Sequence, residues 1–452
     1  MSVVYRYSSL RDWGMFYLII FDVILGFSGS LGKLLNQTTE PLPPIELIAW
    51  HKAPIFEPPN ESHLLATETI DSYLSTLEQQ GVAVDRQGVW LQSDWSELGS
   101  HNGKIPLPAA SLTKVATTLV AIDRFGINHQ FITQIYYTGV IEAGILKGDL
   151  IVVGDNDPFF VWEEAIALAN SLNQLGIQQI TGDLLVSDQF FMNYQRDREK
   201  SATLLYRGLN SRLWTSEVKQ QFKTLPVGTA RPQLQIQGQL KLINQSPDQA
   251  KLLIDHYSLP LVDILRQMNI YSNNYMAQML ADLVGGAAQM ANLASQIIDV
   301  SPEEIQLING SGLGTENRIS PRAATKMLIA INSLLQSHKL SVADIMPVAG
   351  RDFVGTMQNR NLPQGTAIKT GTLNQVSALA GVIPLSEDQN VWFTTINYGW
   401  QIEQFRRQQD VFLQQLVKQW DRQEPQKQQF ERDRNFLGDP QRNQLQYRSN
   451  NP

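Results

Sequence analysis

The stretch "PAASLTKVATTL" (Pro108–Leu119) places Ser111 three residues before Lys114, at the start of a run whose apolar residues have helical spacing. This spacing predicts a helix from about Ser111 to about Phe125, where a glycine follows. Side chains at i and i+3 lie on the same face of a helix. The segment would therefore present a hydroxyl and an amine side by side at the beginning of a helix, where they could form part of a chemical site.

Two later tripeptides decide whether the Ser–Lys pair is a site, because the same S-x-x-K spacing also begins at Ser30 and Ser216. Ser272-Asn273-Asn274 falls where two predicted helical runs meet. Lys369-Thr370-Gly371, the one K-T-G in the chain, falls on a predicted strand next to a turn and a second strand. In this order, S-x-x-K, S-x-N and K-T-G resemble the motif set of penicillin-binding proteins and class A β-lactamases.

The residue types of these motifs suit the activation of a serine nucleophile. A lysine with an ordinary pKa of about 10.4 is a poor base at neutral pH, but burial and a nearby cation lower that pKa. We expect the charge of Lys369 to act in this way on Lys114, so that neutral Lys114 can accept the proton of the Ser111 hydroxyl. Ser272 could relay a proton to the leaving group, and the Asn274 amide could bind the substrate backbone.

The third motif suits substrate binding. Lys369 and Thr370 provide an ammonium and a hydroxyl that can bind a terminal carboxylate. Gly371 would allow the substrate to lie close along the strand edge as an added strand. The backbone N–H groups of Ser111 and Thr372 are expected to form an oxyanion hole, supported by the positive end of the helix that begins at Ser111.

Composition excludes several other classes of site. The 452 residues contain no cysteine, so disulfides, thiol catalysis and iron–sulfur clusters are excluded. The six histidines show no metal-motif spacing, and we predict no metal and no cofactor. We interpret the acidic loop at Asp155 and Asp157 as a turn with capping carboxylates, and His256 as a surface or packing residue. With a net charge of −7 and no basic stripe outside a mixed-charge tail, no nucleic-acid partner is expected.

The first residues of the chain have the pattern of an export signal. Arg6 and Arg11 precede a short apolar run, Trp13–Phe27, and small residues follow it. The run is short for a membrane-spanning helix, which needs about twenty residues. We predict that residues 1–30 are a cleaved signal peptide or an N-terminal membrane anchor that attaches through residues 13–27. The alternative is a buried hydrophobic helix.

Longer segments around the motifs resemble the D-alanyl-D-alanine carboxypeptidase/endopeptidases of the low-molecular-mass, class C penicillin-binding proteins (peptidase family S13). They include "LKGDLIVVGDNDPFF", "NGSGLGTENRISP" and "AIKTGTLNQVSALAG", in the family's order, and the resemblance covers about residues 66–190 and 251–415. It implies an α/β fold of the serine β-lactamase/DD-peptidase (transpeptidase-like) type with an inserted small α/β subdomain. It also implies a periplasmic enzyme that acts on peptidoglycan stem peptides and is acylated by penicillin and other β-lactams. The functional residues that it implies are Ser111 as nucleophile, Lys114 as base, Ser272 and Asn274 as the second element, and Lys369, Thr370 and Gly371 as the third.

The sequence pattern divides the chain into a split domain with an insertion. The predicted parts are a Pro-rich linker (31–62), the first part of the transpeptidase-like domain (63–128), the inserted subdomain (129–250), the second part of the transpeptidase-like domain (251–420) and a disordered polar tail (421–452). In the insert, Pro232–Ile243 predicts a hairpin. Near the end, Thr366–Gly399 predicts three antiparallel strands, and Gln401–Trp420 predicts a closing helix.

The chain departs from the family in several respects. The family usually has a Gly-rich version of the Gly154–Pro158 loop, and the gap between the first and second motifs is short for the family. Asn309 stands where the family usually has Asp, and residues 191–250 match poorly, which predicts a reduced insert. Two other functions remain open at this point. One is a β-lactamase or esterase of the same fold, and the other is a cell-envelope scaffold with little turnover.

Overall fold

The structure is a computed structural model that describes residues 61–386, 389–420 and 435–446. The predicted export segment, residues 1–30, and nearly all of the predicted Pro-rich linker lie outside the described residues. Within the described ranges, no helix combines the length and the apolar character needed to cross a membrane.

A five-stranded antiparallel sheet carries the third motif. Its strand order is β15-β16-β17-β1-β2. The strands are β1 (Gln87–Ser93), β2 (Glu97–His101), β15 (Ala367–Leu373), β16 (Val376–Pro384) and β17 (Asn390–Tyr398). The three strands predicted near the end of the chain are confirmed as β15, β16 and β17, and they pair in the predicted antiparallel sense. Because β1 pairs with β17, the beginning and the end of the transpeptidase-like domain form one sheet.

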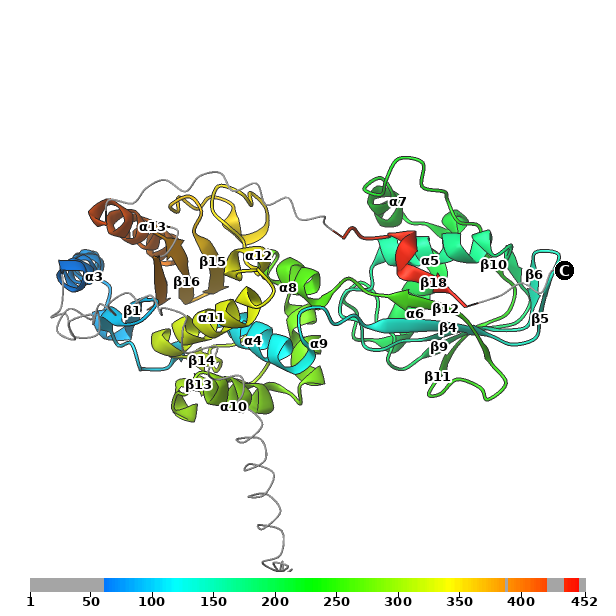
Figure 1. The fold of residues 1–452 in the computed structure, drawn as a ribbon, viewed down its shortest axis with the longest axis horizontal. Coiled ribbons are helices and arrows are strands. Elements are labelled where there is room, and N and C mark those ends of the chain that lie inside the picture. Colours follow the sequence, from blue (N-terminus) through cyan, green and yellow to red (C-terminus); the bar gives the residue numbers. More distant parts are fainter. Residues whose placement is uncertain (1–60, 387–388, 421–434, 447–452) are drawn as a thin grey trace, which may run out of the picture. The chain divides into compact units, whose positions relative to one another are not determined.

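Helices cover both faces of this sheet (Figure 1). Helices α3 (Glu61–Gln79) and α13 (Ile402–Gln419) pack against each other and contact β2 and β16, whereas α11 (Pro321–Gln336) contacts β1 and β17. The apolar stripe predicted for the closing helix is confirmed, since Phe405 and Phe412 are fully buried in α13. Burial of such a stripe is what fixes an amphipathic helix on a sheet.

A cluster of helices holds the first two motifs. These helices are α4 (Thr113–Phe125), α8 (Leu261–Ile270), α9 (Asn274–Leu283), α10 (Ala287–Ile297) and α12 (Val342–Ile345), together with α11. A small sheet of β3 (Leu107–Pro108), β13 (Ile305–Gln306) and β14 (Arg318–Ile319) lies beside them. The Ser320 hydroxyl caps α11 by accepting a hydrogen bond from the Ala323 N–H, and Pro321 occupies the first turn.

The insert is an α/β unit with two sheets. The larger sheet has the order β11-β9-β7-β4-β12-β18, and the smaller has the order β10-β8-β6-β5. Its strands are β4 (Ile132–Tyr137), β5 (Val140–Glu142), β6 (Ile145–Lys147), β7 (Leu150–Val153), β8 (Gln179–Ile180), β9 (Leu184–Ser187), β10 (Gln235–Ile236), β11 (Leu240–Ile243), β12 (Lys251–Tyr257) and β18 (Asn443–Leu445). Its helices are α5 (Trp162–Gln174), α6 (Arg198–Gly208) and α7 (Ser216–Phe222).

The boundary predicted at residue 250 is too early. Strand β12 follows that boundary, but it pairs with β4 and therefore belongs to the sheet of the insert. The insert thus extends to Tyr257, and the chain enters the helical cluster at α8. Sequence alone could not place β12, because a single strand carries no information about which sheet it joins.

The hairpin predicted for Pro232–Ile243 is wrong. Strand β10 pairs in parallel with β8 in the smaller sheet, and β11 pairs in parallel with β9 in the larger sheet. The chain crosses between the sheets at Gly182 and again at Gly238, where the two crossings touch. A Cβ atom on Gly238 would lie 2.2 Å from the Gly182 carbonyl oxygen. The glycine is therefore present for close backbone contact and not for a turn between paired strands.

Part of the tail predicted to be disordered is an ordered element of the insert. Residues 435–446 are described, and β18 within them pairs antiparallel with β12. The Arg442 guanidinium donates to both carboxylate oxygens of Glu164, at 2.6 and 2.8 Å, and both side chains are buried. Asn443 contacts the ring of buried His256 at 2.6 Å, so His256 is a packing residue, and burial lowers the pKa of its imidazole.

Removal of the Arg442 guanidinium should destabilise the insert. In Arg442→Met, the Glu164 carboxylate would stay buried without its charged partner, a change that costs about 3–5 kcal/mol. The measurement is urea unfolding followed by tryptophan fluorescence. The exposed pair Lys147–Glu142 provides the control, since Lys147→Met should cost less than about 1 kcal/mol. Equal, small effects of the two substitutions would contradict the buried pairing, whereas adding Glu164→Gln to Arg442→Met should restore part of the loss.

Candidate active site

The first motif lies at a tight turn into α4. Ser111 is in the short 3₁₀ helix η4 (Ala110–Leu112), and α4 begins directly after it. Ala110 has a φ of 46°, the left-handed conformation that a side-chain-bearing residue rarely adopts. The Lys114 amine donates a hydrogen bond of 3.0 Å to the Ser111 hydroxyl. The predicted pairing of hydroxyl and amine at the start of a helix is therefore present in the structure.

The second motif meets the first at the Lys114 amine. Lys114 Nζ donates to Asn274 Oδ1 at 2.8 Å and to the Ser311 carbonyl oxygen at 2.7 Å. Asn274 is the first residue of α9, and the helical runs α8 and α9 meet at the motif as predicted. Between them, Ser272 has a φ of 51°, so the junction turns sharply at the serine itself.

The third motif meets the second. The Lys369 amine, on β15, donates to the Ser272 hydroxyl at 3.0 Å and to the Thr370 carbonyl oxygen at 2.8 Å. Three segments separated by 160 and 97 residues are thus linked by hydrogen bonds from two lysine amines. Each amine contacts one serine hydroxyl: Lys114 contacts Ser111, and Lys369 contacts Ser272.

Burial controls the charge of both amines. Lys114 is fully buried, and burial lowers the pKa of its amine to about 7. Lys369 is also fully buried. Burial and, second, the charge of Lys114 lower the pKa of Lys369 well below its usual range. Burial is the main cause of the lowered pKa at Lys114, and the two amines repel each other when both are charged, as expected from the motif. Among the described residues, no carboxylate contributes to the pKa shift of either amine, so no nearby negative charge opposes the effect of burial.

Gly371 brings the strand and the nucleophile segment together. A Cβ atom on Gly371 would lie 2.7 Å from the Ala109 carbonyl oxygen and 3.1 Å from the Ser111 nitrogen. The absent side chain therefore makes room for the turn that carries Ser111. The expectation that Gly371 also lets a substrate lie close along the strand edge stays a prediction.

A fourth segment, Asn309–Leu313, supports the site and was not assigned a role from the sequence. The Asn309 side-chain oxygen accepts hydrogen bonds from the N–H groups of Ser311 and Gly312, at 3.1 and 2.7 Å. Its side-chain nitrogen donates to the Leu313 carbonyl at 2.6 Å. An Asp, which the family usually has at this position, would lack this N–H donor. The hydrogen bond from the Asn309 side chain to the Leu313 carbonyl therefore depends on the Asn of this chain. The loop places the Ser311 carbonyl oxygen next to the Lys114 amine. The sequence could not predict this contact, because every residue has a backbone carbonyl.

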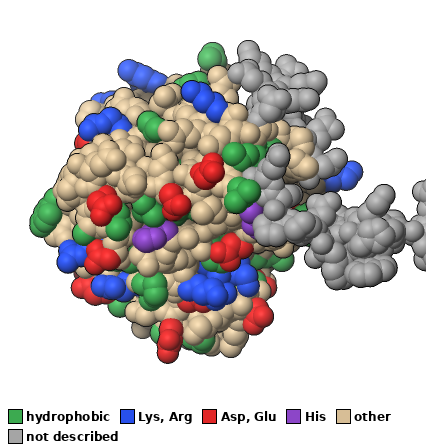
Figure 2. Space-filling model, turned by 90° about the vertical axis from the view of Figure 1, so that its left-hand side faces the viewer, with side chains coloured by type: hydrophobic (Ala, Val, Ile, Leu, Met, Phe, Trp, Pro, Cys, Tyr) green, Lys and Arg blue, Asp and Glu red, His purple; other side chains and the backbone are tan. Residues whose placement is uncertain are grey.

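The acidic loop agrees with its interpretation as a turn with capping carboxylates. The Asp157 carboxylate accepts a hydrogen bond from the Phe159 N–H at 2.8 Å, as expected of a capping carboxylate in a turn. Across the described residues, no group of three or more His, Cys, Asp or Glu side chains could hold a metal ion. On the face drawn in Figure 2, Lys and Arg are interspersed with Asp and Glu.

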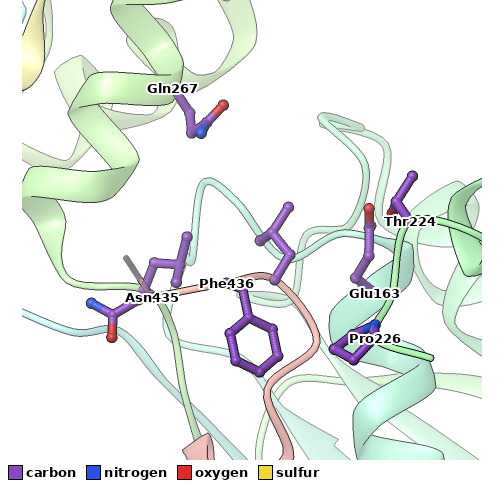
Figure 3. A pocket seen from close by; sticks show the side chains of 8 residues that line it. Glu163, Thr224, Pro226, Gln267, Asn435 and Phe436 are labelled. Atoms are coloured by element: carbon purple, nitrogen blue, oxygen red, sulfur yellow. The ribbon is translucent and has the colours of Figure 1, made fainter. Parts of the chain in front are cut away.

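A cavity of about 400 Å³ lies apart from the motif residues (Figure 3). It is lined by Glu163, Thr224, Pro226, Leu259, Gln267, Asn435, Phe436 and Leu437. Burial raises the pKa of the Glu163 carboxyl to about 7. Since none of the three motifs contributes to its lining, this cavity is not the site that the lysine amines build.

Comparison with known proteins agrees with the resemblance seen in the motifs. The model of the D-Ala-D-Ala carboxypeptidase 3 (S13) family matches residues 67–203 and 230–418. The D-alanyl-D-alanine carboxypeptidase DacB of Haemophilus influenzae is 24% identical over 401 residues, which cover 67% of this chain and 83% of that protein. The unmatched residues 204–229 fall within the stretch that looked unlike the family.

Solved structures share the fold. The Bd3459 predatory peptidoglycan endopeptidase of Bdellovibrio bacteriovorus is 21% identical, with a TM-score of 0.64 over 75% of this chain and 94% of that one. A penicillin G-acylated form of Bd3459, in complex with an immunity protein, is 23% identical, with a TM-score of 0.62 over 74% and 90% of the two chains. Because the family model matches more than half of its residues, this chain belongs to the D-Ala-D-Ala carboxypeptidase 3 (S13) family.

Proposed function

We propose that this protein is a serine D-alanyl-D-alanine carboxypeptidase that cleaves peptidoglycan stem peptides through a seryl acyl-enzyme and is acylated by penicillin. The observation that carries the proposal is the buried Lys114 amine, 3.0 Å from the Ser111 hydroxyl, with a pKa lowered to about 7. With this pKa, about half of the Lys114 amines are neutral near pH 7 and can act as a general base. A DD-endopeptidase activity uses the same chemistry on a cross-linked peptide.

In the acylation step, neutral Lys114 accepts the hydroxyl proton of Ser111 while the Ser111 oxygen attacks the peptide carbonyl carbon. The N–H groups of Ser111 and Thr372 stabilise the resulting oxyanion. The proton passes through the Ser272 hydroxyl to the leaving D-alanine nitrogen as the C–N bond breaks, and the Lys369 amine holds Ser272 for this transfer. Water then attacks the ester carbonyl, and Lys114 acts again as the base.

The substrate is proposed to bind along β15, which lies at one edge of its sheet. An edge strand offers backbone donors and acceptors to an extended peptide. Asn274 is exposed, and its oxygen faces Lys114, which leaves its amide nitrogen for the substrate backbone. The Thr370 hydroxyl and the Lys369 amine suit the terminal carboxylate of the substrate, because a bound carboxylate would raise the pKa of that amine and favour its charged form.

The proposed substrate is a cell-wall polymer, and we therefore propose that the protein acts in the cell envelope, in the periplasm. Residues 1–30 would direct its export, either as a cleaved signal or as an anchor through the apolar run at 13–27. Export can be tested by cell fractionation of the full chain and of a chain that lacks residues 2–30.

Labelled penicillin should acylate Ser111. The wild-type protein should retain the label through denaturing electrophoresis, and Ser111→Ala should not. Ser216→Ala is the matched control, because Ser216 begins another S-x-x-K sequence on an exposed helix and should be labelled like wild type. Rapid loss of the label would instead identify a β-lactamase, and absence of label on wild type would identify a scaffold.

Release of D-alanine from a pentapeptide then measures the proposed reaction.

Acylation should depend on the protonation of Lys114. Because the base must be deprotonated, the acylation rate should rise with pH, reach half of its maximum near pH 7 and fall about tenfold per pH unit below pH 6. Lys114→Arg stays protonated and should lose about 10²–10⁴-fold in rate. Lys219→Arg, in the exposed S-x-x-K sequence, should leave the profile unchanged. A rate that is flat from pH 5 to 9 would rule out a lysine base of this pKa.

A further inference from the structure

The Lys114 amine faces three oxygen atoms, and one of them can donate a proton to it. The amine lies 3.0 Å from the Ser111 hydroxyl, 2.8 Å from the Asn274 side-chain oxygen and 2.7 Å from the Ser311 carbonyl oxygen. A charged amine donates to all three, but a neutral amine has two N–H groups and one lone pair. Since the amide and carbonyl oxygens can only accept, they take the two N–H groups, and the lone pair is left to face the hydroxyl. The Ser311 carbonyl therefore helps to aim the base at its nucleophile.

The peptide unit that carries this carbonyl is held from its other side by Asn309. A trans peptide is planar, and its C=O and N–H groups point in opposite directions. The Ser311 C=O shares a peptide unit with the Gly312 N–H, which donates to the Asn309 side-chain oxygen at 2.7 Å, while the carbonyl accepts from Lys114. Asn309 thus fixes the plane of this peptide unit. A hydrogen bond to the N–H of an amide also strengthens its carbonyl as an acceptor.

The contacts of Asn309 use both groups of an uncharged amide. Its oxygen also accepts from the N–H groups of Ser311 and Leu313, at 3.1 and 3.2 Å, and from the Ser311 hydroxyl at 2.9 Å. Its nitrogen donates to the Leu313 carbonyl at 2.6 Å. A carboxylate could replace the acceptor but not the donor, and it would bring a negative charge into the loop.

That charge would act on an amine whose surroundings hold no opposing charge. The Asn309 oxygen lies no more than about 8 Å from the Lys114 amine, one peptide unit and two hydrogen bonds away. Among the described residues, no carboxylate contributes to the pKa shift of Lys114, and Lys369 on β15 is a cation whose own pKa responds to the charge of Lys114. Glu316, on the same loop, is exposed, and Asp282, on α9, is exposed and ion-paired. A neutral residue 309 therefore leaves the effect of burial on Lys114 unopposed.

We infer that Asn309 is a positioning residue of the general base: through the Gly312 N–H it holds the Ser311 carbonyl against the Lys114 amine, and as an uncharged amide it keeps a negative charge away from that amine. The inference rests on the proposed function and adds to it the device that aims the base at Ser111 and favours its neutral form. Asn309 acts through the backbone of its loop.

The effect of charge is tested by Asn309→Asp, which keeps a side-chain oxygen and adds a negative charge. A charge at this distance should raise the pH at which acylation by labelled penicillin reaches half of its maximum by about one unit. The rate at pH 6 should therefore fall about tenfold, while the rate at pH 9 changes less than about threefold. Asn210→Asp is the matched control, because the Asn210 side chain also accepts from a backbone N–H, at 3.0 Å, but lies in the insert. It should leave the midpoint unchanged.

The effect of the hydrogen bond is tested by Asn309→Ala, which removes the acceptor of the Gly312 N–H and adds no charge. The rate at pH 9 should fall about ten- to a hundredfold, because the neutral amine is no longer aimed at the hydroxyl. Asn309→Asp, which retains the acceptor, should stay close to wild type at this pH. A role in stability alone would lower the melting temperature of both variants without moving the midpoint of the pH profile.

The titration of the Lys114 side chain by ¹³C NMR gives a readout that needs no acylation. Its midpoint should rise by about one unit in Asn309→Asp and stay unchanged in Asn210→Asp. An unchanged midpoint in Asn309→Asp, an equal shift in Asn210→Asp, or a wild-type rate at pH 9 in Asn309→Ala would overturn the inference and leave the proposed function intact. If Asn309→Ala does not fold, the midpoint of Asn309→Asp decides. If wild type is not acylated at Ser111, the proposed function fails, and the inference that rests on it fails as well.

Discussion

The site depends on one buried amine. Lys114 contacts the hydroxyl of Ser111, the side-chain oxygen of Asn274 and the carbonyl oxygen of Ser311 at 2.7 to 3.0 Å. Within the part of the chain that the structure describes, no carboxylate contributes to the pKa shift of this amine. Burial of a charge without an opposite charge is costly, so the amine gives up its proton at a much lower pH than in water. The fold thus turns an ordinary lysine into a base, and the three oxygen atoms fix where it acts.

The rest of the domain serves to hold these groups together. The nucleophile segment packs against β15 because Gly371 has no side chain, and the third motif reaches the second through the Lys369 amine. The sheet that carries β15 also contains β1, which comes from the beginning of the domain and pairs with β17. Strain at Ala110 and Ser272 is tolerated because the surrounding helices and strands determine both turns.

Much of this arrangement could be predicted from the sequence, because it depends on the spacing of residues that are close together in the chain. The strands of the third motif, the helix after Ser111 and the apolar stripe of α13 follow from the spacing of apolar residues. The contacts of the motif residues follow from their chemistry. What the sequence could not show are contacts made by backbone atoms, such as the Ser311 carbonyl. It also could not show that Gly371 makes room for the turn that carries Ser111.

The insert was predicted less well for a related reason. Its short strands pair with partners distant in the chain, so a local pattern at Pro232–Ile243 suggested a hairpin that does not form. The polar composition of the tail predicted disorder, but a single buried pair, Arg442 with Glu164, and one added strand order residues 435–446. The composition of a segment indicates how much apolar surface it can bury on average. It does not show whether one of its charged residues forms a buried ion pair.

The most direct test of this account is the pKa of Lys114 itself. The signal of its side-chain carbon next to the amine can be followed by ¹³C NMR as the pH is changed, and it can be assigned by its absence in Lys114→Arg. The account predicts a titration midpoint near pH 7 in the free protein. A midpoint near 10, the ordinary value for lysine, would contradict the claim that burial makes Lys114 the base.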